Sequence, residues 1–146
     1  MPSKQKIKKF VDSQKSIQFY DKIKKAFIEV LSNFSDDEFS ICTENLILMV
    51  LHEGALGQVM HFPASKNKFK IVQLTISSKM PMKMMRYVIA HELGHVMQGR
   101  NWRKSDGEKL ETDANEWAKK WGFPLDESIL KWMYTDRHIK RKYRIK

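Results

Sequence analysis

The chain of 146 residues lacks several features that would mark other classes of protein. Its single cysteine, Cys42, excludes an internal disulfide and a zinc site built from several thiolates. The longest apolar run covers residues 46–51, whereas a membrane-spanning helix needs about 20 apolar residues. No apolar stretch directly follows the basic N-terminal residues, so no secretory signal is recognised. We therefore expect a protein that stays in the reducing cytoplasm and makes no use of the membrane.

Acidic residues are also scarce relative to basic ones. The chain has 17 Asp and Glu against 27 Lys and Arg, a net charge of +10. The excess lies mainly in two segments, residues 1–16 and 137–146, which we interpret as basic tails. Such tails attract nucleic acid, anionic lipid or acidic protein, and net charge does not choose among these partners. Two interpretations stay open: solvated tails that aid solubility, or tails that contact nucleic acid.

What is present indicates one folded α+β domain spanning residues 1–146. Apolar residues make up 42% of the chain, too many for a disordered protein, and its length suits a single core. Apolar spacing predicts an N-terminal packing helix, three short strands in an antiparallel sheet, and three further helices. In order, these elements cover residues 17–34, 46–51, 58–62, 69–76, 81–98, 108–121 and 126–137.

The predicted helix at residues 81–98 carries the sequence His91-Glu92-Leu93-Gly94-His95, an H-E-x-x-H pattern. Residues four apart on a helix lie about 40° from each other around its axis, so both imidazoles can reach one ion. The neighbouring residues are apolar, and buried ionisable groups are costly unless they are paired or coordinated. The pattern therefore predicts a metal site. The alternative is that hydrogen bonds within the core satisfy both histidines.

Catalytic zinc usually has three protein ligands and keeps a fourth position for water. Position 101 is Asn, so the extended pattern with a third histidine is absent. The other histidines fall in a turn, a strand and a basic tail: His52, His61 and His138. We therefore expect an acidic third ligand from the helix at residues 108–121. Glu111 and Asp113 lie at opposite margins of its apolar face, and periodicity does not separate them.

Together, the two motifs resemble the ImmA/IrrE-like zinc metallopeptidases. That family pairs H-E-x-x-H with a downstream E-x-x-A-N-x-aromatic-A segment, and this chain reads Glu-Thr-Asp-Ala-Asn-Glu-Trp-Ala at residues 111–118. The resemblance covers residues 57–130, about half of the chain. It implies a small zincin-like domain of the gluzincin type, with zinc bound by His91, His95 and Glu111. It also implies that Glu92 is the general base and that Asp113 has a supporting or surface role.

The implied chemistry is also sound on physical grounds. Two neutral imidazoles and one carboxylate leave a zinc site near +1, which polarises a carbonyl and brings bound water towards a pKa of about 7. Glu92 can accept the proton of that water and pass it to the leaving amine. The expected function is therefore zinc-dependent hydrolysis of a protein or peptide. The resemblance implies a DNA-binding repressor as the target.

Several features of such an enzyme stay open in the sequence. The strand at residues 69–76 either offers its edge to an extended substrate or is an ordinary sheet strand. Candidates for stabilising an oxyanion are not separated by spacing: Tyr87, Arg100, Tyr134 and His138. The sequence specifies neither the substrate nor the oligomeric state.

A rival interpretation is a nucleic-acid-binding or scaffolding protein. Its zinc site would be structural or silent, and its basic tails would make the contacts. A structural site has no use for Glu92 and usually closes its fourth position with a protein ligand. A third interpretation combines the two, as a protease that docks on DNA through its tails.

Overall fold

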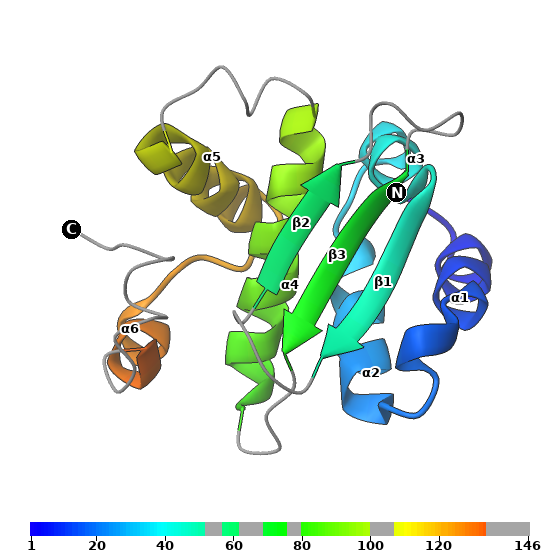
Figure 1. The fold of residues 1–146 in the computed structure, drawn as a ribbon, viewed down its shortest axis with the longest axis horizontal. Coiled ribbons are helices and arrows are strands. Elements are labelled where there is room, and N and C mark those ends of the chain that lie inside the picture. Colours follow the sequence, from blue (N-terminus) through cyan, green and yellow to red (C-terminus); the bar gives the residue numbers. More distant parts are fainter. Residues whose placement is uncertain (52–56, 62–68, 76–79, 100–106, 134–146) are drawn as a thin grey trace.

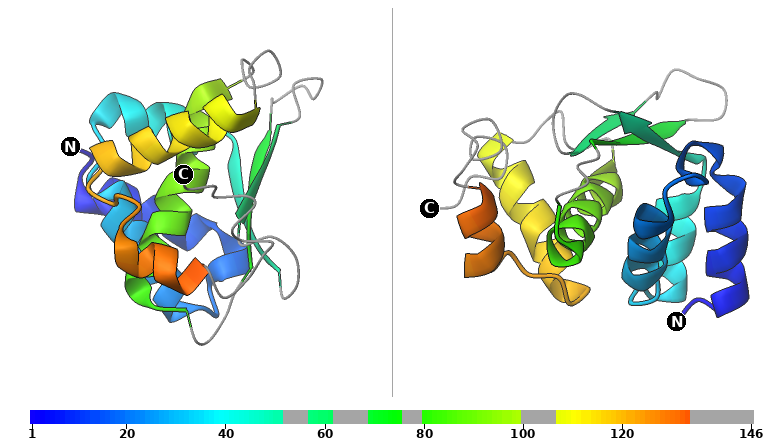
Figure 2. Two further views of the ribbon diagram at one scale, coloured as in Figure 1. Left: turned by 90° about the vertical axis from the view of Figure 1, so that its left-hand side faces the viewer. Right: turned by 90° about the horizontal axis from the view of Figure 1, so that it is seen from below.

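The computed structural model describes residues 1–51, 57–61, 69–75, 80–99 and 107–133. The fold is α+β, as predicted, and in these ranges it has six α-helices, a 3-10 turn and three strands. Figure 2 shows the sheet on one side of the molecule and the helices packed on its other side. The elements are α1 Lys4–Ser13, η1 Lys15–Ile17, α2 Asp21–Leu31, α3 Asp36–Thr43, β1 Leu46–Leu51, β2 Gly57–His61, β3 Lys70–Thr75, α4 Met82–Gln98, α5 Gly107–Lys120 and α6 Glu127–Met133.

The sheet is mixed, so the predicted antiparallel arrangement is wrong. The strand order is β1-β3-β2, with β3 in the centre (Figure 1). β2 pairs antiparallel with β3, placing Val59 opposite Val72, whereas β1 runs parallel to β3, placing Leu48 opposite Val72. Periodicity identifies strands but carries no information about which strands become neighbours. β1 skips β2, the next strand in the chain, and pairs with β3 instead.

Side chains that precede the sheet in sequence cover the outer edge of β1. The backbone N–H of Leu48 donates to Gln14 Oε1 at 2.9 Å, and Gln14 Nε2 donates to the carbonyl oxygen of Leu46 at 3.2 Å. The N–H of Val50 donates to Ser16 Oγ at 3.0 Å. These bonds satisfy backbone groups that a neighbouring strand would otherwise take.

Two helices are additions to the predicted set. α1 lies within the segment interpreted as a basic tail, and it packs on the core through Ile7 and Val11. Because lysines are frequent in this segment, its short apolar stripe is not apparent from the sequence. α3 begins with a capping box in which Ser35 and Glu38 bond to each other's backbone N–H groups. The C-terminal tail, residues 137–146, lies outside the described residues.

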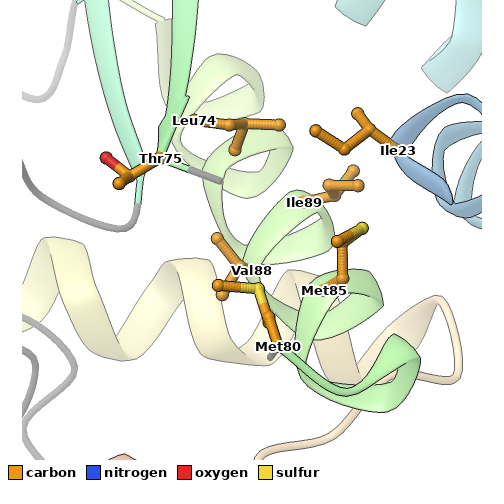
Figure 3. Close-up of a pocket in the computed structure, with 7 residues that line it drawn as sticks. All are labelled: Ile23, Leu74, Thr75, Met80, Met85, Val88 and Ile89. Atoms are coloured by element: carbon orange, nitrogen blue, oxygen red, sulfur yellow. The ribbon is translucent and has the colours of Figure 1, made fainter. Parts of the chain in front are cut away.

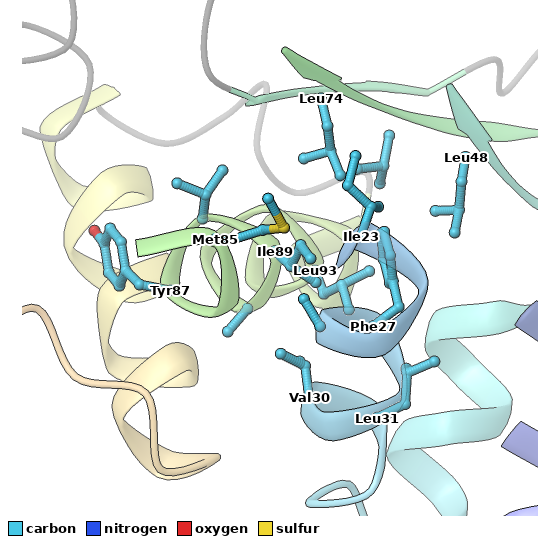
Figure 4. Packing of buried hydrophobic residues seen from close by; sticks show 14 of the residues in the cluster. Ile23, Phe27, Val30, Leu31, Leu48, Leu74, Met85, Tyr87, Ile89 and Leu93 are labelled. Carbon is cyan, nitrogen blue, oxygen red and sulfur yellow. The ribbon is translucent and has the colours of Figure 1, made fainter. Parts of the chain in front are cut away.

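α4 is the central helix of the molecule. It begins after Pro81 and ends at Gly99, whose φ of 61° suits glycine. Its side chains pack between the sheet, α2 and α5 (Figure 4). Ile89 and Leu93 are buried against Phe27 of α2 within one apolar core. Ionisable residues on the faces of α4 that meet the sheet, α2 or α5 are therefore wholly or partly buried, whereas Lys83 near its start is exposed.

No helix in the described ranges is both long and apolar enough to cross a bilayer.

Candidate metal centre

The H-E-x-x-H motif lies in the second half of α4, inside the protein. His91 and Glu92 are both 0% exposed. His95 follows one helical turn after His91, with its side chain 15% exposed. The two imidazole rings are perpendicular, and their centroids are 4.8 Å apart. The predicted helix geometry thus brings both rings to one point on the α4 surface that faces α5.

The helix α5 brings Glu111 to the same point. Its Oε2 atom lies 2.9 Å from His91 Nε2, and its Oε1 atom lies 3.3 Å from His95 Nε2. Asp113, which periodicity could not separate from Glu111, instead pairs with Lys109 at 3.1 Å on the protein surface. The side chain of Asp113 is 43% exposed. The structure therefore brings Glu111, and not Asp113, to the two histidines.

Gly94 allows α4 and α5 to approach closely enough for this contact. A Cβ atom on Gly94 would lie 2.9 Å from the carbonyl oxygen of Ala114 and 3.0 Å from Cβ of Trp117. Both of those atoms belong to α5. A glycine inside a helix costs about 1 kcal/mol relative to alanine. Here the cost is offset because glycine lets α5 pack close to α4, which brings the Glu111 carboxylate within reach of the two histidines.

The carboxylate is ionised at neutral pH. Burial raises the pKa of Glu111, but the hydrogen bonds with His91 and His95 outweigh this effect and lower its pKa to about 2. Burial lowers the pKa of His95, but its bond with Glu111 and the charge of Glu92 outweigh that, and the net shift is upward. An ionised carboxylate held between two imidazoles favours binding of a cation.

The geometry fits a metal ion. One ligand atom from each of His91, His95 and Glu111 can be chosen so that all three lie within 4.8 Å of one another. A tetrahedral ion with bonds of about 2.0 Å has ligand atoms about 3.3 Å apart, close to the 2.9 and 3.3 Å contacts seen here. These three residues could therefore hold a metal ion. Nitrogen and carboxylate donors suit several divalent transition metals, so the donor set does not identify the ion.

Glu92 lies beside this group of ligand atoms but does not belong to it. Its side chain lies under the start of β2, where a Cβ atom on Gly57 would come within 2.7 Å of Glu92 Oε1. Glycine at this position lets the strand pass directly over the carboxylate. No local sequence pattern indicated this contact, because Gly57 and Glu92 are far apart in the chain.

Two amide side chains near the histidines, those of Asn115 and Gln98, had no role predicted from the sequence. Asn115 Oδ1 lies 2.8 Å from His91 Nδ1, and Gln98 Oε1 lies 2.9 Å from His95 Nδ1. The Tyr87 hydroxyl donates to the same Asn115 oxygen at 2.5 Å. Spacing offered a signal, because Asn115 is one helical turn after Glu111 and Gln98 is one turn after His95.

The other predicted candidates are placed as follows. Tyr87, one candidate for stabilising an oxyanion, is 0% exposed and lies on the Nδ1 side of His91, away from the Nε2 atom that faces Glu111. Its hydroxyl therefore points away from the candidate metal position. The remaining candidates, and the side chain of His61, lie outside the described residues: His52, Arg100, Tyr134 and His138.

A mainly apolar pocket lies below the end of β3, next to the motif (Figure 3). Val88, in its wall, is one helical turn before Glu92, and Leu74 pairs with Gly57 across the sheet. Most of its lining residues are buried, so the pocket belongs to the apolar core between α2, α4 and the end of β3. The full lining is Ile23, Leu74, Thr75, Met80, Met85, Val88 and Ile89.

Comparisons with family models, curated proteins and solved structures give no match for this chain. The resemblance described above therefore rests on the residues of the two motifs. The structure adds an independent observation, the convergence of three ligand atoms from α4 and α5.

Proposed function

We propose that this protein is a zinc-dependent peptidase that hydrolyses peptide bonds of a protein partner. The observation that carries the proposal is the meeting of His91, His95 and Glu111 at one point, with Glu92 beside them and outside the ligand group. A structural metal site would have no use for this fourth, buried acidic side chain. The resemblance of the motifs to those of ImmA/IrrE-like metallopeptidases supports the same activity.

Zinc is the ion we propose, because two imidazoles and one carboxylate with an open fourth position form a common catalytic zinc site. When bound there, zinc would supply Lewis acidity that polarises a peptide carbonyl and makes water more acidic. Glu92 would act as general base, taking a proton from water and delivering it to the leaving amine. Its burial under β2 excludes bulk solvent and keeps the carboxylate in one place.

Of the two interpretations left open for residues 69–76, the structure agrees with an ordinary sheet strand rather than an edge offered to substrate. β3 is the central strand, with β1 on one side and β2 on the other. Within the described ranges, β2 pairs only with β3, and it passes over Glu92. We therefore propose that an extended substrate pairs with the outer edge of β2, which would bring a peptide bond next to the general base.

The target class follows from the resemblance alone. Metallopeptidases of the ImmA/IrrE type are associated with the control of DNA-binding repressors, and we propose a repressor-like protein partner in the cytoplasm as the substrate.

The test compares Glu92→Gln with wild type for bound zinc and for cleavage of a casein substrate and of unstructured peptides. We expect full zinc content and a loss of cleavage of at least a hundredfold, because a general base contributes about 10²–10⁴ in rate. Glu116→Gln is the matched control, because Glu116 is an exposed residue of α5. Unchanged cleavage in Glu92→Gln would remove Glu92 as the base.

A second candidate function, nucleic-acid binding, is favoured by one observation. The exposed side of α1 carries four lysines: Lys4, Lys6, Lys8 and Lys9. Binding through these residues would weaken by about one power of salt concentration for each phosphate neutralised. Replacing them with glutamine would then abolish binding, whereas the peptidase proposal expects cleavage of a short peptide to be unaffected.

A further inference from the structure

We infer that Asn115 and Gln98 are positioning residues that fix both histidines in the tautomer able to bind a metal ion, and that Tyr87 holds Asn115 in place. The inference rests on the metal site of the proposed function. It does not depend on peptidase activity, because it concerns only how tightly the site holds an ion.

The argument begins with the side of each ring that faces away from Glu111. A neutral imidazole carries one hydrogen, on either Nδ1 or Nε2, and only the other nitrogen can bind a metal. Both rings direct Nε2 towards Glu111. For both Nε2 atoms to be ligands, each Nδ1 must carry the hydrogen and needs an acceptor.

His95 has such an acceptor in Gln98. Nδ1 of His95 lies 2.9 Å from Gln98 Oε1, and Gln98 Nε2 donates to the carbonyl oxygen of Leu110 at 2.8 Å. A carbonyl oxygen only accepts hydrogen bonds, so the contact with Leu110 fixes which end of the amide is nitrogen. The oxygen end must therefore face His95, and His95 carries its hydrogen on Nδ1.

His91 has the equivalent acceptor in Asn115, supplied by the opposite helix. The contact is 2.8 Å long, from His91 Nδ1 to Asn115 Oδ1. The Tyr87 hydroxyl donates to the same oxygen at 2.5 Å and lies 3.4 Å from His91 Nδ1. One amide oxygen thus accepts from two donors of α4, which fixes the amide against rotation. Figure 4 shows Tyr87 directed from α4 towards α5.

The consequence is that, once a metal ion displaces the hydrogens that the Nε2 atoms share with Glu111, two ring lone pairs and one carboxylate are directed at a single point. These groups repel one another unless a cation lies among them. The amides also join α4 and α5 on both sides of the centre, because Gln98 bonds to the α5 backbone while Asn115 reaches back to α4. Ligand orientation is thereby tied to the packing of the two helices. Removing such partners of a metal-binding histidine typically costs 10–100-fold in metal affinity.

The experiment measures the zinc dissociation constant by competition with a chromophoric chelator, and the visible absorption of the cobalt-substituted protein. Asn115→Leu and Gln98→Met should weaken zinc binding by about 10–100-fold. Asn115→Asp and Gln98→Glu, which keep an acceptor oxygen, should stay within about threefold of wild type and retain its cobalt spectrum. Tyr87→Phe should produce a smaller loss than Asn115→Leu, because the acceptor remains.

The matched control is Asn33→Leu. The Asn33 amide also bonds to a backbone carbonyl, that of Trp121 at 2.8 Å, but it lies outside the candidate centre. This variant should lower thermal stability and leave zinc affinity unchanged. A merely structural role for Asn115 and Gln98 predicts that their variants behave like Asn33→Leu.

Three results would separate the hypotheses. Wild-type affinity in Asn115→Leu and Gln98→Met, or affinity in Asn115→Asp as weak as in Asn115→Leu, would overturn the positioning role. If Asn115→Leu does not fold, Tyr87→Phe and the Gln98 pair decide the question. If the variants change zinc affinity as expected but the wild-type protein cleaves no substrate, the peptidase proposal is overturned and the positioning role is supported.

Discussion

Gly57 and Glu92 are in direct contact across the interface between β2 and α4, so closely that a Cβ atom on Gly57 would lie 2.7 Å from Glu92 Oε1. The absence of a side chain at residue 57 therefore determines where the proposed general base can lie. This contact links the proposed substrate edge, the proposed base and the candidate metal ligands within one short region of the molecule.

We predict that Gly57→Ala lowers kcat/KM by about 10–100-fold while bound zinc stays at the wild-type level. The added methyl group must displace either β2 or the Glu92 carboxylate, and misplacing a general base removes much of its contribution. Peptide hydrolysis and zinc content are measured on the same preparation. Gly107→Ala is the control, because nothing lies within 4 Å of its added methyl group. Full activity in Gly57→Ala would contradict the proposed place of Glu92.

Gly94→Ala should destabilise the protein by about 1–3 kcal/mol, since overpacking forces α4 and α5 apart. The sign of this stability change is informative, because a glycine-to-alanine substitution on an open helix surface would stabilise the protein by about 1 kcal/mol. Urea unfolding of the metal-free protein measures the effect. We also expect weaker zinc binding, because Glu111 lies on the displaced helix. If Gly94→Ala were more stable than wild type, the interface between α4 and α5 would have space for the added methyl group, contrary to this prediction.

Glu111→Gln should reduce zinc affinity by at least a hundredfold, since it removes the only anionic ligand of the group in the described residues. Asp113→Asn is the matched control, two residues away on the same helix, where Asp113 pairs with Lys109. Isothermal titration with zinc measures both variants. A larger loss of affinity in Asp113→Asn than in Glu111→Gln would reverse the assignment of the third ligand.

Stability at acid pH should depend on Glu38. Burial raises the pKa of Glu38, but hydrogen bonds from Lys120, Ser35 and Trp121 outweigh this and lower its pKa from 4.5 to about 2. The folded state therefore binds this proton less readily than the unfolded state. The contribution is fully present above about pH 4.5 and is lost as the pH falls towards about 2.

Glu38→Gln tests this dependence. At pH 6 it should lower the free energy of unfolding by about 2 kcal/mol, the scale of a hydrogen bond to a charged group. Urea unfolding between pH 6 and pH 2 should show the difference from wild type shrinking as the pH falls. The exposed Glu116→Gln variant serves as reference. A difference that is constant over this range would assign the effect to packing rather than to charge.

The helix-borne part of the site could be predicted from sequence because helical geometry is local. The spacing of His91 and His95 fixes their relation whatever the rest of the chain does. The third ligand required a non-local contact between α4 and α5, and periodicity left Glu111 and Asp113 equal. Only the motif resemblance favoured Glu111, and the structure brings that residue to the histidines.

The parts that could not be predicted are those that depend on neighbours far apart in sequence. The strand spans were predicted to within one residue at each end, but the placement of β3 between β1 and β2 was not. The first helix was overlooked because Ile7 and Val11 are its only buried residues among many lysines. The contacts of Asn115 and Gln98 likewise require knowing how α4 and α5 meet.

The bonds from Gln14 and Ser16 to β1 make the two borders of the sheet unequal. Because the N–H groups of Leu48 and Val50 already donate to these side chains, another extended chain cannot pair with them. Addition of a strand at this edge is therefore disfavoured. Among the described strands, β2 therefore keeps an edge without a strand partner, and β2 lies over the Glu92 carboxylate. If β2 pairs with the substrate as proposed, a partner chain captured by main-chain pairing would lie next to Glu92, and a second copy of this protein bound at the same edge would compete with the substrate.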